Sequence, residues 1–201
     1  MMDITFDDVL RMALQKPGEK TFPVSVQVAC LGLDTFPIRG LHTLDVGCGD
    51  GRLLEYLLSE GAIAEGIGPL NGVRHEHIIP NLIYNVAPHS GSIPRPNETY
   101  DLSLAHNVVP VRRAFCSLYN EIKSSDPETP SLVQKGGIIL LEVHRVLRKG
   151  GRFVVFPQLD ELDPANARFS YGFDLKHEKV PEAYFLAEGE PQKYRTVLTK
   201  L

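Results

Sequence analysis

Residues 43–57, TLDVGCGDGRLLEYL, constrain the fold of this chain more than any other stretch. A short β-prone run at 42–46 leads through Gly47, Gly49 and Gly51 into a helical pattern. In an open α/β sheet such a joint lies beyond the carboxyl end of a strand, where ligands bind. Glycines let the backbone approach a ligand closely, and the helix N-terminus offers free amide donors. The stretch therefore predicts a nucleotide-like ligand at this joint.

From residue 41 onward, strand and helix patterns alternate along the chain. The helical patterns are RLLEYLLSEG and GGIILLEVHRVLRKGG, and the strand candidates are HTLDV, AIAEGIG, LIYNV, YDLSLA and RFVVFP. GFDLKHEKV and KYRTVLTK then resemble a closing antiparallel pair. This order predicts an α/β fold: a Rossmann-like, doubly wound, mostly parallel seven-stranded sheet with an antiparallel C-terminal strand pair and helices on both faces.

At 201 residues the chain is expected to form a single domain, residues 1–201. Its predicted parts are an N-terminal helical or irregular cap, a core and the C-terminal strand pair, over residues 1–40, 41–157 and 158–201. Within the cap, residues 5–14 have the spacing of one helical face. The alternation of Val24, Val26 and Val28 fits either an extended segment or part of a helix.

Composition excludes several classes of protein. Apolar residues make up 43% of the chain, and no window approaches the eighteen or so apolar residues that a membrane span needs. The first residues lack a secretory pattern, so a cytoplasmic location is expected. Cys30, Cys48 and Cys116 share no C-x-x-C spacing, which argues against a disulfide framework and a zinc site. The net charge of −4 does not support binding to nucleic acid.

The glycine spacing discriminates between nucleotide-like ligands. A dinucleotide fingerprint, G-x-G-x-x-G, that begins at Gly47 requires a third glycine at position 52, where Arg52 stands. Asp45 with Gly47, Gly49 and Gly51 instead resembles the first motif of class I S-adenosylmethionine-dependent methyltransferases.

Two later segments resemble motifs of the same family in the same order. They are YDLSLAHNVV at 100–109 and LLEVHRVLRKGGRFVVFP at 140–157. The chain is therefore similar to a small, methyltransferase type 11-like domain. The resemblance implies that residues 41–157 bind S-adenosylmethionine, with the loop from Asp45 through Cys48 to Gly51 wrapped around the methionine part of the cofactor.

The resemblance also implies two carboxylates that this chain lacks. One ends the second strand and accepts hydrogen bonds from the ribose hydroxyls, and counting from Asp45 places Gly68 there. Glu65 is the nearest acid, but its odd separation from position 68 points it to the opposite face of a strand. The other acid meets the adenine amino group, and its place falls on Pro88 or His89. A neutral His89 ring can still accept a hydrogen bond, so this half of the site is expected to be degenerate.

His106 follows the fourth strand, where the resemblance places a methyl acceptor. It is therefore both a cofactor-site residue and the candidate general base. A histidine that is merely hydrogen-bonded at a strand end is an equal alternative. No Asn-Pro-Pro-Tyr or Asp-Pro-Pro-Tyr run follows this strand, which argues against amino-methylation of nucleic acid bases. His75 and His77 lack a clustered third ligand, so no metal is expected.

The most favoured function is a methyltransferase with an unknown acceptor, which is large or presented by a protein partner. The segment after the fifth strand, QLDELDPANARFS, is short and would leave the site open. One alternative is a methyltransferase-like fold with weak or no cofactor binding that acts as a binding or scaffold partner. Another is an α/β domain whose glycine loop holds a different ligand.

Two further helical patterns carry structural expectations. Within the extra segment 110–136, the apolar residues Val111, Phe115, Leu118 and Ile122 share one helical face, for which packing on the domain's own core is the favoured interpretation. In the later helix, Glu142 and Arg145 are spaced to pair on the helix surface.

Overall fold

The structure, a computed structural model, describes residues 23–68, 82–84, 92–108, 111, 115, 129–185 and 191–201. The helix predicted over 5–14 lies outside these residues, as do His75, His77, Pro88 and His89. The helices of the described chain are α2 (Val24–Leu31), α3 (Arg52–Ser59), α6 (Thr129–Val146) and α7 (Pro164–Tyr171). None of these helices has the length and apolar character required to cross a membrane.

The strands form one seven-stranded sheet of order β3-β2-β1-β4-β5-β7-β6. Their bounds are β1 (His42–Val46), β2 (Ile63–Gly68), β3 (Leu82–Tyr84), β4 (Tyr100–His106), β5 (Leu147–Phe156), β6 (Phe173–Phe185) and β7 (Pro191–Lys200). Strands β1 to β5 pair in parallel, whereas β7 runs antiparallel to both β5 and β6. The predicted α/β class and the predicted antiparallel C-terminal pair are confirmed.

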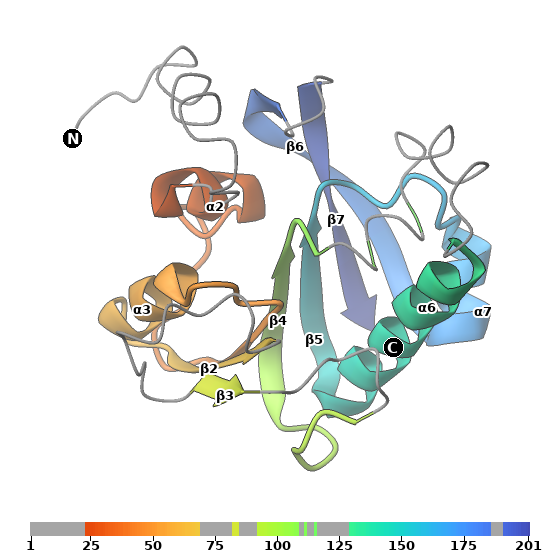
Figure 1. The fold of residues 1–201 in the computed structure, drawn as a ribbon, viewed down its shortest axis with the longest axis horizontal. Coiled ribbons are helices and arrows are strands. Elements are labelled where there is room, and N and C mark those ends of the chain that lie inside the picture. The colour runs from red at the N-terminus through yellow and green to blue at the C-terminus, as the bar shows by residue number, and fades with distance from the viewer. Residues whose placement is uncertain are drawn as a thin grey trace.

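Helices cover both faces of the sheet. In Figure 1, α2 and α3 lie on one side of the central strands, and α6 and α7 lie on the other. Strands β2 and β3 lie on one side of β1, and β4 and β5 lie on the other side. The strand order therefore reverses between β1 and β4. Ligands of open α/β sheets bind at such a reversal, outside the carboxyl ends of the strands. The segment after Val46 lies at this point.

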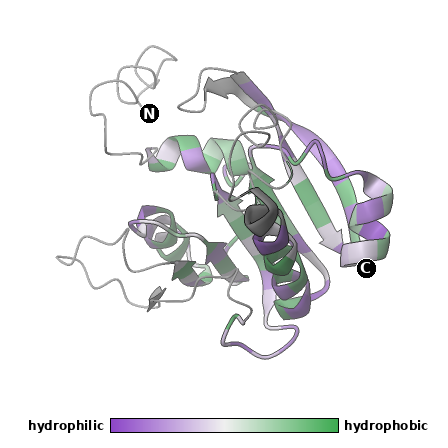
Figure 2. Ribbon diagram, turned by 45° about the vertical axis from the view of Figure 1, so that its right-hand side comes forward, coloured by the Kyte–Doolittle hydropathy of each residue, from purple (hydrophilic) through white to green (hydrophobic). Residues whose placement is uncertain are grey.

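The core lies between the sheet and the two helical layers. Its largest fully buried side chains include Tyr100, Phe153, Phe156 and Phe173. Figure 2 shows the central strands as mostly hydrophobic and α7 as mainly hydrophilic. Val111 and Phe115 are buried in the same core, as expected for the extra segment, while Leu118 and Ile122 lie outside the described residues.

Two helices, α2 and α7, go beyond the elements predicted from the sequence. Residues 24–31 form α2, and it ends at Gly32. Helix α7 is not among the elements predicted from the sequence, although Asp163 and Pro164 are typical of a helix start. The Asp163 side chain accepts a hydrogen bond from the Asn166 backbone N–H at 2.8 Å, and Pro164 occupies the first turn. The part of the chain assigned to the C-terminal strand pair therefore also contains a helix.

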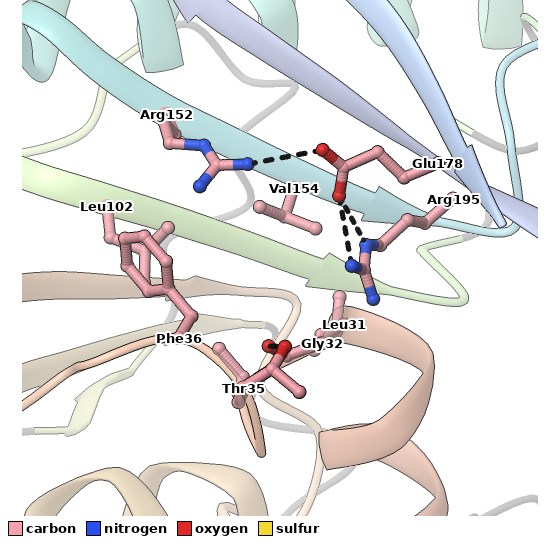
Figure 3. A pocket seen from close by; sticks show the side chains of 10 residues that line it. Leu31, Gly32, Thr35, Phe36, Leu102, Arg152, Val154, Glu178 and Arg195 are labelled. Atoms are coloured by element: carbon pink, nitrogen blue, oxygen red, sulfur yellow. Dashed lines mark hydrogen bonds and ion pairs between the residues drawn. The ribbon is translucent and has the colours of Figure 1, made fainter. Parts of the chain in front are cut away.

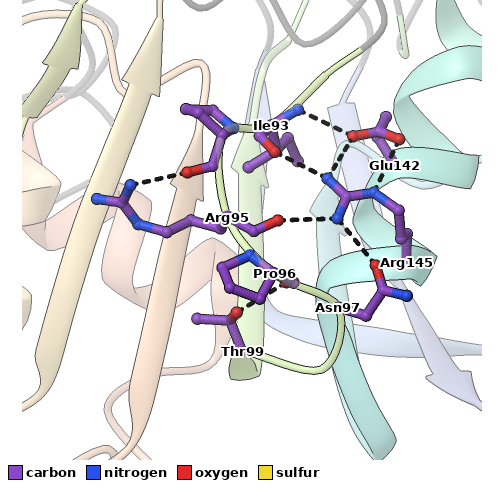
Figure 4. A network of polar contacts seen from close by, with 8 residues as sticks. Ile93, Arg95, Pro96, Asn97, Thr99, Glu142 and Arg145 are labelled. Carbon is purple, nitrogen blue, oxygen red and sulfur yellow. Dashed lines mark hydrogen bonds and ion pairs between the residues drawn. The ribbon is translucent and has the colours of Figure 1, made fainter.

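Glu142 and Arg145 form the predicted pair on α6, with Arg145 Nη2 and Glu142 Oε2 at 2.8 Å. The same two side chains also hold the segment before β4 (Figure 4). The Ile93 N–H donates to Glu142 Oε2 at 2.9 Å, and Arg145 donates to the carbonyl oxygens of Ile93 and Arg95, each at 2.8 Å. The pair therefore fixes the entry of the chain into β4.

Arg145→Met should lower the free energy of unfolding by about 2 kcal/mol, because it leaves a charged partner and two carbonyl groups without their donor. In a chain of this size that corresponds to a fall in Tm of roughly 4 to 8 °C, measurable by thermal unfolding. Arg148→Met is the matched control, since Arg148 forms a more exposed ion pair with Asp101. Its cost should stay below about 1 kcal/mol. Equal losses in the two variants would contradict this role for Arg145.

Candidate functional site

The loop after β1 is joined to the end of β2. The Gly47 and Cys48 N–H groups both donate to the Ile67 carbonyl oxygen, at 2.8 and 3.1 Å. Gly47 has a φ of 74°, and a Cβ at this position would lie 2.7 Å from Val108 Cγ2. Both the backbone conformation and the close approach require glycine here.

Gly49 lies at the open side of this loop. Its φ is 55°, and no heavy atom of the described residues lies within 4 Å of the position that a Cβ would occupy. The chain then passes Asp50, whose carboxylate pairs with Arg52 at 2.7 Å, and α3 begins after Gly51. The loop therefore presents backbone toward a space that no described residue fills, at the N-terminus of a helix, as expected for a ligand cradle.

Asp45 lies beneath this loop at the end of β1 and is 2% exposed. Within the described part of the chain, its Oδ2 atom has no hydrogen-bond partner. Burial, together with the charge of Asp50, raises the pKa of the Asp45 carboxyl to about 7. A buried carboxylate without a partner is costly, and a cationic group on a ligand would supply the missing interaction. Asp45 and the loop thus fit the amino acid half of S-adenosylmethionine, which carries an ammonium group.

Gly68 faces the same loop from the end of β2. A Cβ at Gly68 would lie 3.4 Å from Cys48 Sγ and 3.9 Å from the Gly49 nitrogen. Glu65 is engaged elsewhere: its two carboxylate oxygens accept hydrogen bonds from Arg95 at 2.6 and 2.8 Å, and it also binds the Tyr100 hydroxyl. These contacts agree with the expectation that Glu65 does not replace the missing acid at position 68.

His106 ends β4 at the same edge of the sheet. Its ring stacks on Phe156, with the ring centroids 5.5 Å apart. Burial lowers the pKa of the imidazole to about 3. The ring is therefore neutral near pH 7. Its pKa lies far below the value near 7 that suits a general base, so His106 is a weak base.

Among the residues described at this site, no set of metal ligands is gathered. The described residues contain no group of three or more His, Cys, Asp or Glu side chains arranged to hold an ion. Burial raises the pKa of the Cys48 thiol well above its usual range, so the sulfur stays protonated and is a poor ligand.

No protein-family model matches the sequence, and no curated protein matches it. Solved structures do resemble its fold. A Haloferax volcanii complex that contains the Trm112 methyltransferase activator matches with a TM-score of 0.53 and 14% identity over 96% of each chain. An S-adenosylmethionine-dependent methyltransferase from Mesorhizobium loti matches with a TM-score of 0.52 and 14% identity, over 85% of this chain and 95% of that one.

The magnesium protoporphyrin IX methyltransferase of Synechocystis, solved with bound S-adenosylmethionine, is similar over the whole of this chain and 86% of its own. Its TM-score is 0.53 and its identity 14%. This chain therefore has the class I fold of the S-adenosylmethionine-dependent methyltransferases. At these identities the likeness establishes the fold, and the activity has to be argued from the site.

Proposed function

We propose that the chain binds S-adenosylmethionine at the loop from Asp45 to Gly51 and transfers its methyl group to an acceptor. The observation that carries the proposal is the Asp45 carboxylate, which is buried beneath an open glycine loop and has an oxygen without a partner among the described residues. A cofactor with an ammonium group would satisfy it. The fold shared with the solved methyltransferases supports the same assignment.

Each element of the site has a role in this proposal. Asp45 binds the ammonium group, Gly47 brings the backbone close, and Gly49 leaves room for the ligand. The wall of the cofactor site is completed by Cys48, Gly51 and Gly68. His89 is proposed to lie near the adenine. When bound, S-adenosylmethionine supplies an electrophilic methyl group on a sulfonium. An in-line displacement of this kind depends chiefly on positioning, so it requires no strong base from the protein.

His106 is proposed to contact the acceptor from the end of β4. Because burial lowers the pKa of its ring to about 3, its role is that of a neutral hydrogen-bonding wall and not of a proton acceptor. Nucleophiles that need no deprotonation are therefore the acceptors that best fit this site.

The acceptor is proposed to be a large molecule or one presented by a protein partner, in the cytoplasm. The solved complex with the Trm112 activator shows that a chain of this fold can occur together with a partner protein. The second candidate function, a methyltransferase-like scaffold with little or no cofactor binding, is favoured by one observation. Position 68 is Gly68, which offers no carboxylate to the ribose.

Titration of the purified chain with S-adenosylmethionine and S-adenosylhomocysteine separates these two candidates. We expect heat of binding with an affinity about ten- to a hundredfold below that of a site with the ribose acid, because hydrogen bonds to a charged group are lost. No heat and no thermal shift at millimolar ligand would favour the scaffold.

Gly49→Leu should then abolish binding, since its side chain would fill the space left for the ligand. Gly40→Leu is the matched control. Gly40 also has a positive φ, 78°, and open space around the Cβ position, but it precedes β1 at the opposite edge of the sheet. The Gly40→Leu variant should lose as much stability as Gly49→Leu and keep its affinity for S-adenosylmethionine. Loss of binding in both variants would contradict the assignment of the loop.

A further inference from the structure

We propose that a cavity on the α2 face of the sheet binds a small organic anion, a carboxylate or phosphate carried on a ring-sized apolar body. The cavity has a volume of about 160 Å³ and lies between the turn that follows α2 and strands β4 to β7 (Figure 3). Its lining includes Leu102 of β4 and Val154 of β5, but no residue of the glycine loop from Asp45 to Gly51. It is therefore separate from that loop, and the proposal does not depend on the proposed function.

One wall of the cavity carries more positive than negative charge. Glu178 Oε2 accepts from Arg195 Nε and Nη2 at 3.1 and 2.9 Å, while Oε1 lies 3.7 Å from Arg152 Nη2 and 3.0 Å from Lys176 Nζ. Three cations thus share one carboxylate. The two arginine side chains are only 13% and 32% exposed, so their charges are partly removed from solvent. A second anion would balance this cluster.

The two guanidinium groups have donors left for that anion. A guanidinium carries five N–H donors in a planar fork that matches carboxylate and phosphate oxygens. Arg195 uses Nε and Nη2 on Glu178, and its Nη1 has no acceptor among the described residues. The 3.7 Å contact of Arg152 with Glu178 is longer than a hydrogen bond. Both arginines line the cavity, so the remaining donors can reach a ligand there.

The chain around α2 is built to admit these arginines. A Cβ at Gly32 would lie only 2.1 Å from Arg195 Nη1, so the glycine makes room for the guanidinium at the end of the helix. On the other side, the Arg152 guanidinium carbon lies 5.0 Å from the centroid of the Phe36 ring. This cation–π contact holds Arg152 over the cavity.

The opposite wall is mostly apolar, and its one hydroxyl, that of Thr35, donates to the Gly32 carbonyl oxygen. Figure 3 shows Leu31, Phe36 and Leu102 on the side away from Glu178, and Val154 between the two arginines. A cavity of about 150 Å³ lined by apolar side chains holds a benzene molecule, so a cavity of 160 Å³ has room for one ring. The combination of an apolar wall and a cationic wall selects a ligand such as an aromatic or short aliphatic acid over a bare inorganic ion.

Calorimetric titration of the full chain with benzoate, phenyl phosphate and benzamide tests the proposal. We expect both anions to bind and the neutral benzamide to bind at least about tenfold more weakly, because it cannot accept charge-assisted hydrogen bonds from both arginines. If benzoate binds more tightly, the natural ligand is a carboxylate. If phenyl phosphate binds more tightly, it is a phosphate ester. Equal binding of benzamide, or no binding of either anion at millimolar concentration, would overturn the proposal.

Variants locate the binding at this cavity. Arg152→Met should weaken benzoate binding about tenfold, and Arg152→Lys, which keeps the charge and loses the fork, should weaken it by a smaller factor. Lys176→Met is the matched control, because Lys176 contacts Glu178 from outside the lining and is 72% exposed. It should change the affinity less than about threefold.

The cofactor loop supplies the remaining control. Saturating S-adenosylhomocysteine should leave benzoate binding unchanged. A benzoate signal that this ligand displaces, and that Arg152→Lys leaves intact, would show that the anion binds at the loop and would refute the cavity site. If S-adenosylhomocysteine does not bind at all, the proposed function fails while the benzoate measurement still decides this proposal.

Discussion

Gly68→Asp should raise the affinity for S-adenosylmethionine by about ten- to a hundredfold, because a carboxylate at this position can accept hydrogen bonds from both ribose hydroxyls. The backbone of Gly68 permits the change, since its φ lies outside the left-handed range. The nearest neighbours of a Cβ there, Cys48 Sγ and the Cys48 nitrogen, would lie at 3.4 and 3.6 Å. These are ordinary van der Waals separations, so a Cβ at position 68 fits without displacing the loop. Calorimetric titration measures the gain.

Gly68→Ala is the control for this gain, because it adds the Cβ without the charge. Its affinity should remain within about threefold of the parent chain, since no hydrogen bond is added. An unchanged affinity in Gly68→Asp, with Tm preserved, would show that the ligand does not place a ribose beside the end of β2. A higher affinity in Gly68→Asp would mean that the natural site is a weakened form of a methyltransferase site and not a site for an unrelated ligand.

Asp45→Asn should stabilise the protein and abolish cofactor binding at the same time. The folded pKa of Asp45 is about 7, whereas its ordinary value is 3.8. A raised folded pKa means that the native state binds a proton more tightly than the unfolded state does. The parent chain therefore loses stability as pH rises from about 4 to 7, and Asn at this position removes that loss.

The gain in free energy of unfolding should reach about 4 kcal/mol at pH 8 and fall away below about pH 4. It corresponds to an increase in Tm of roughly 8 to 16 °C at the higher pH. Glu55→Gln is the control, since Glu55 is an exposed acid on α3 and its replacement should stay within about 0.5 kcal/mol at both pH values. A gain that is the same at pH 4 and pH 8 would contradict the raised pKa.

The loss of binding in Asp45→Asn should exceed about tenfold, because the neutral amide cannot pair with an ammonium group. A variant that is more stable and inactive is the expected outcome where a protein keeps a buried charge for a ligand. Retained affinity would remove the main observation on which the proposed function rests.

Much of the core of the fold could be predicted from the sequence because its signals are local. The run at 42–46 and the helix after Gly51 were predicted from glycine position and apolar spacing, and both are confirmed. The sequence alone does not decide α2, because an alternation of valines over five residues fits either a strand or one face of a buried helix. Burial on the sheet settles it: Val26, Val28, Cys30 and Leu31 all lie in the core.

The site was predictable only in part, for a physical reason. Counting from Asp45 assigns Gly68 to the position that the ribose-binding acid occupies in the family. Strand alternation predicts that Glu65 points away from position 68. The burial of Asp45 and the lowered pKa of His106 depend on how the whole sheet surrounds them, and local sequence carries no record of this. The cluster of Arg152, Glu178 and Arg195 was not predicted either. Its members come from three strands, and only the pairing of β6 with β7 sets Glu178 opposite Arg195.

Proton release on cofactor binding tests the central claim most directly. If the ammonium group of the ligand pairs with Asp45, binding must ionise that carboxyl, which is about half protonated at pH 7 in the free protein because its pKa is about 7. Titration with S-adenosylhomocysteine at pH 7, in two buffers with different heats of ionisation, should therefore show release of about half a proton per ligand bound. The release should disappear in Asp45→Asn. Binding without any proton release in the parent chain, or no binding at all, would contradict the account.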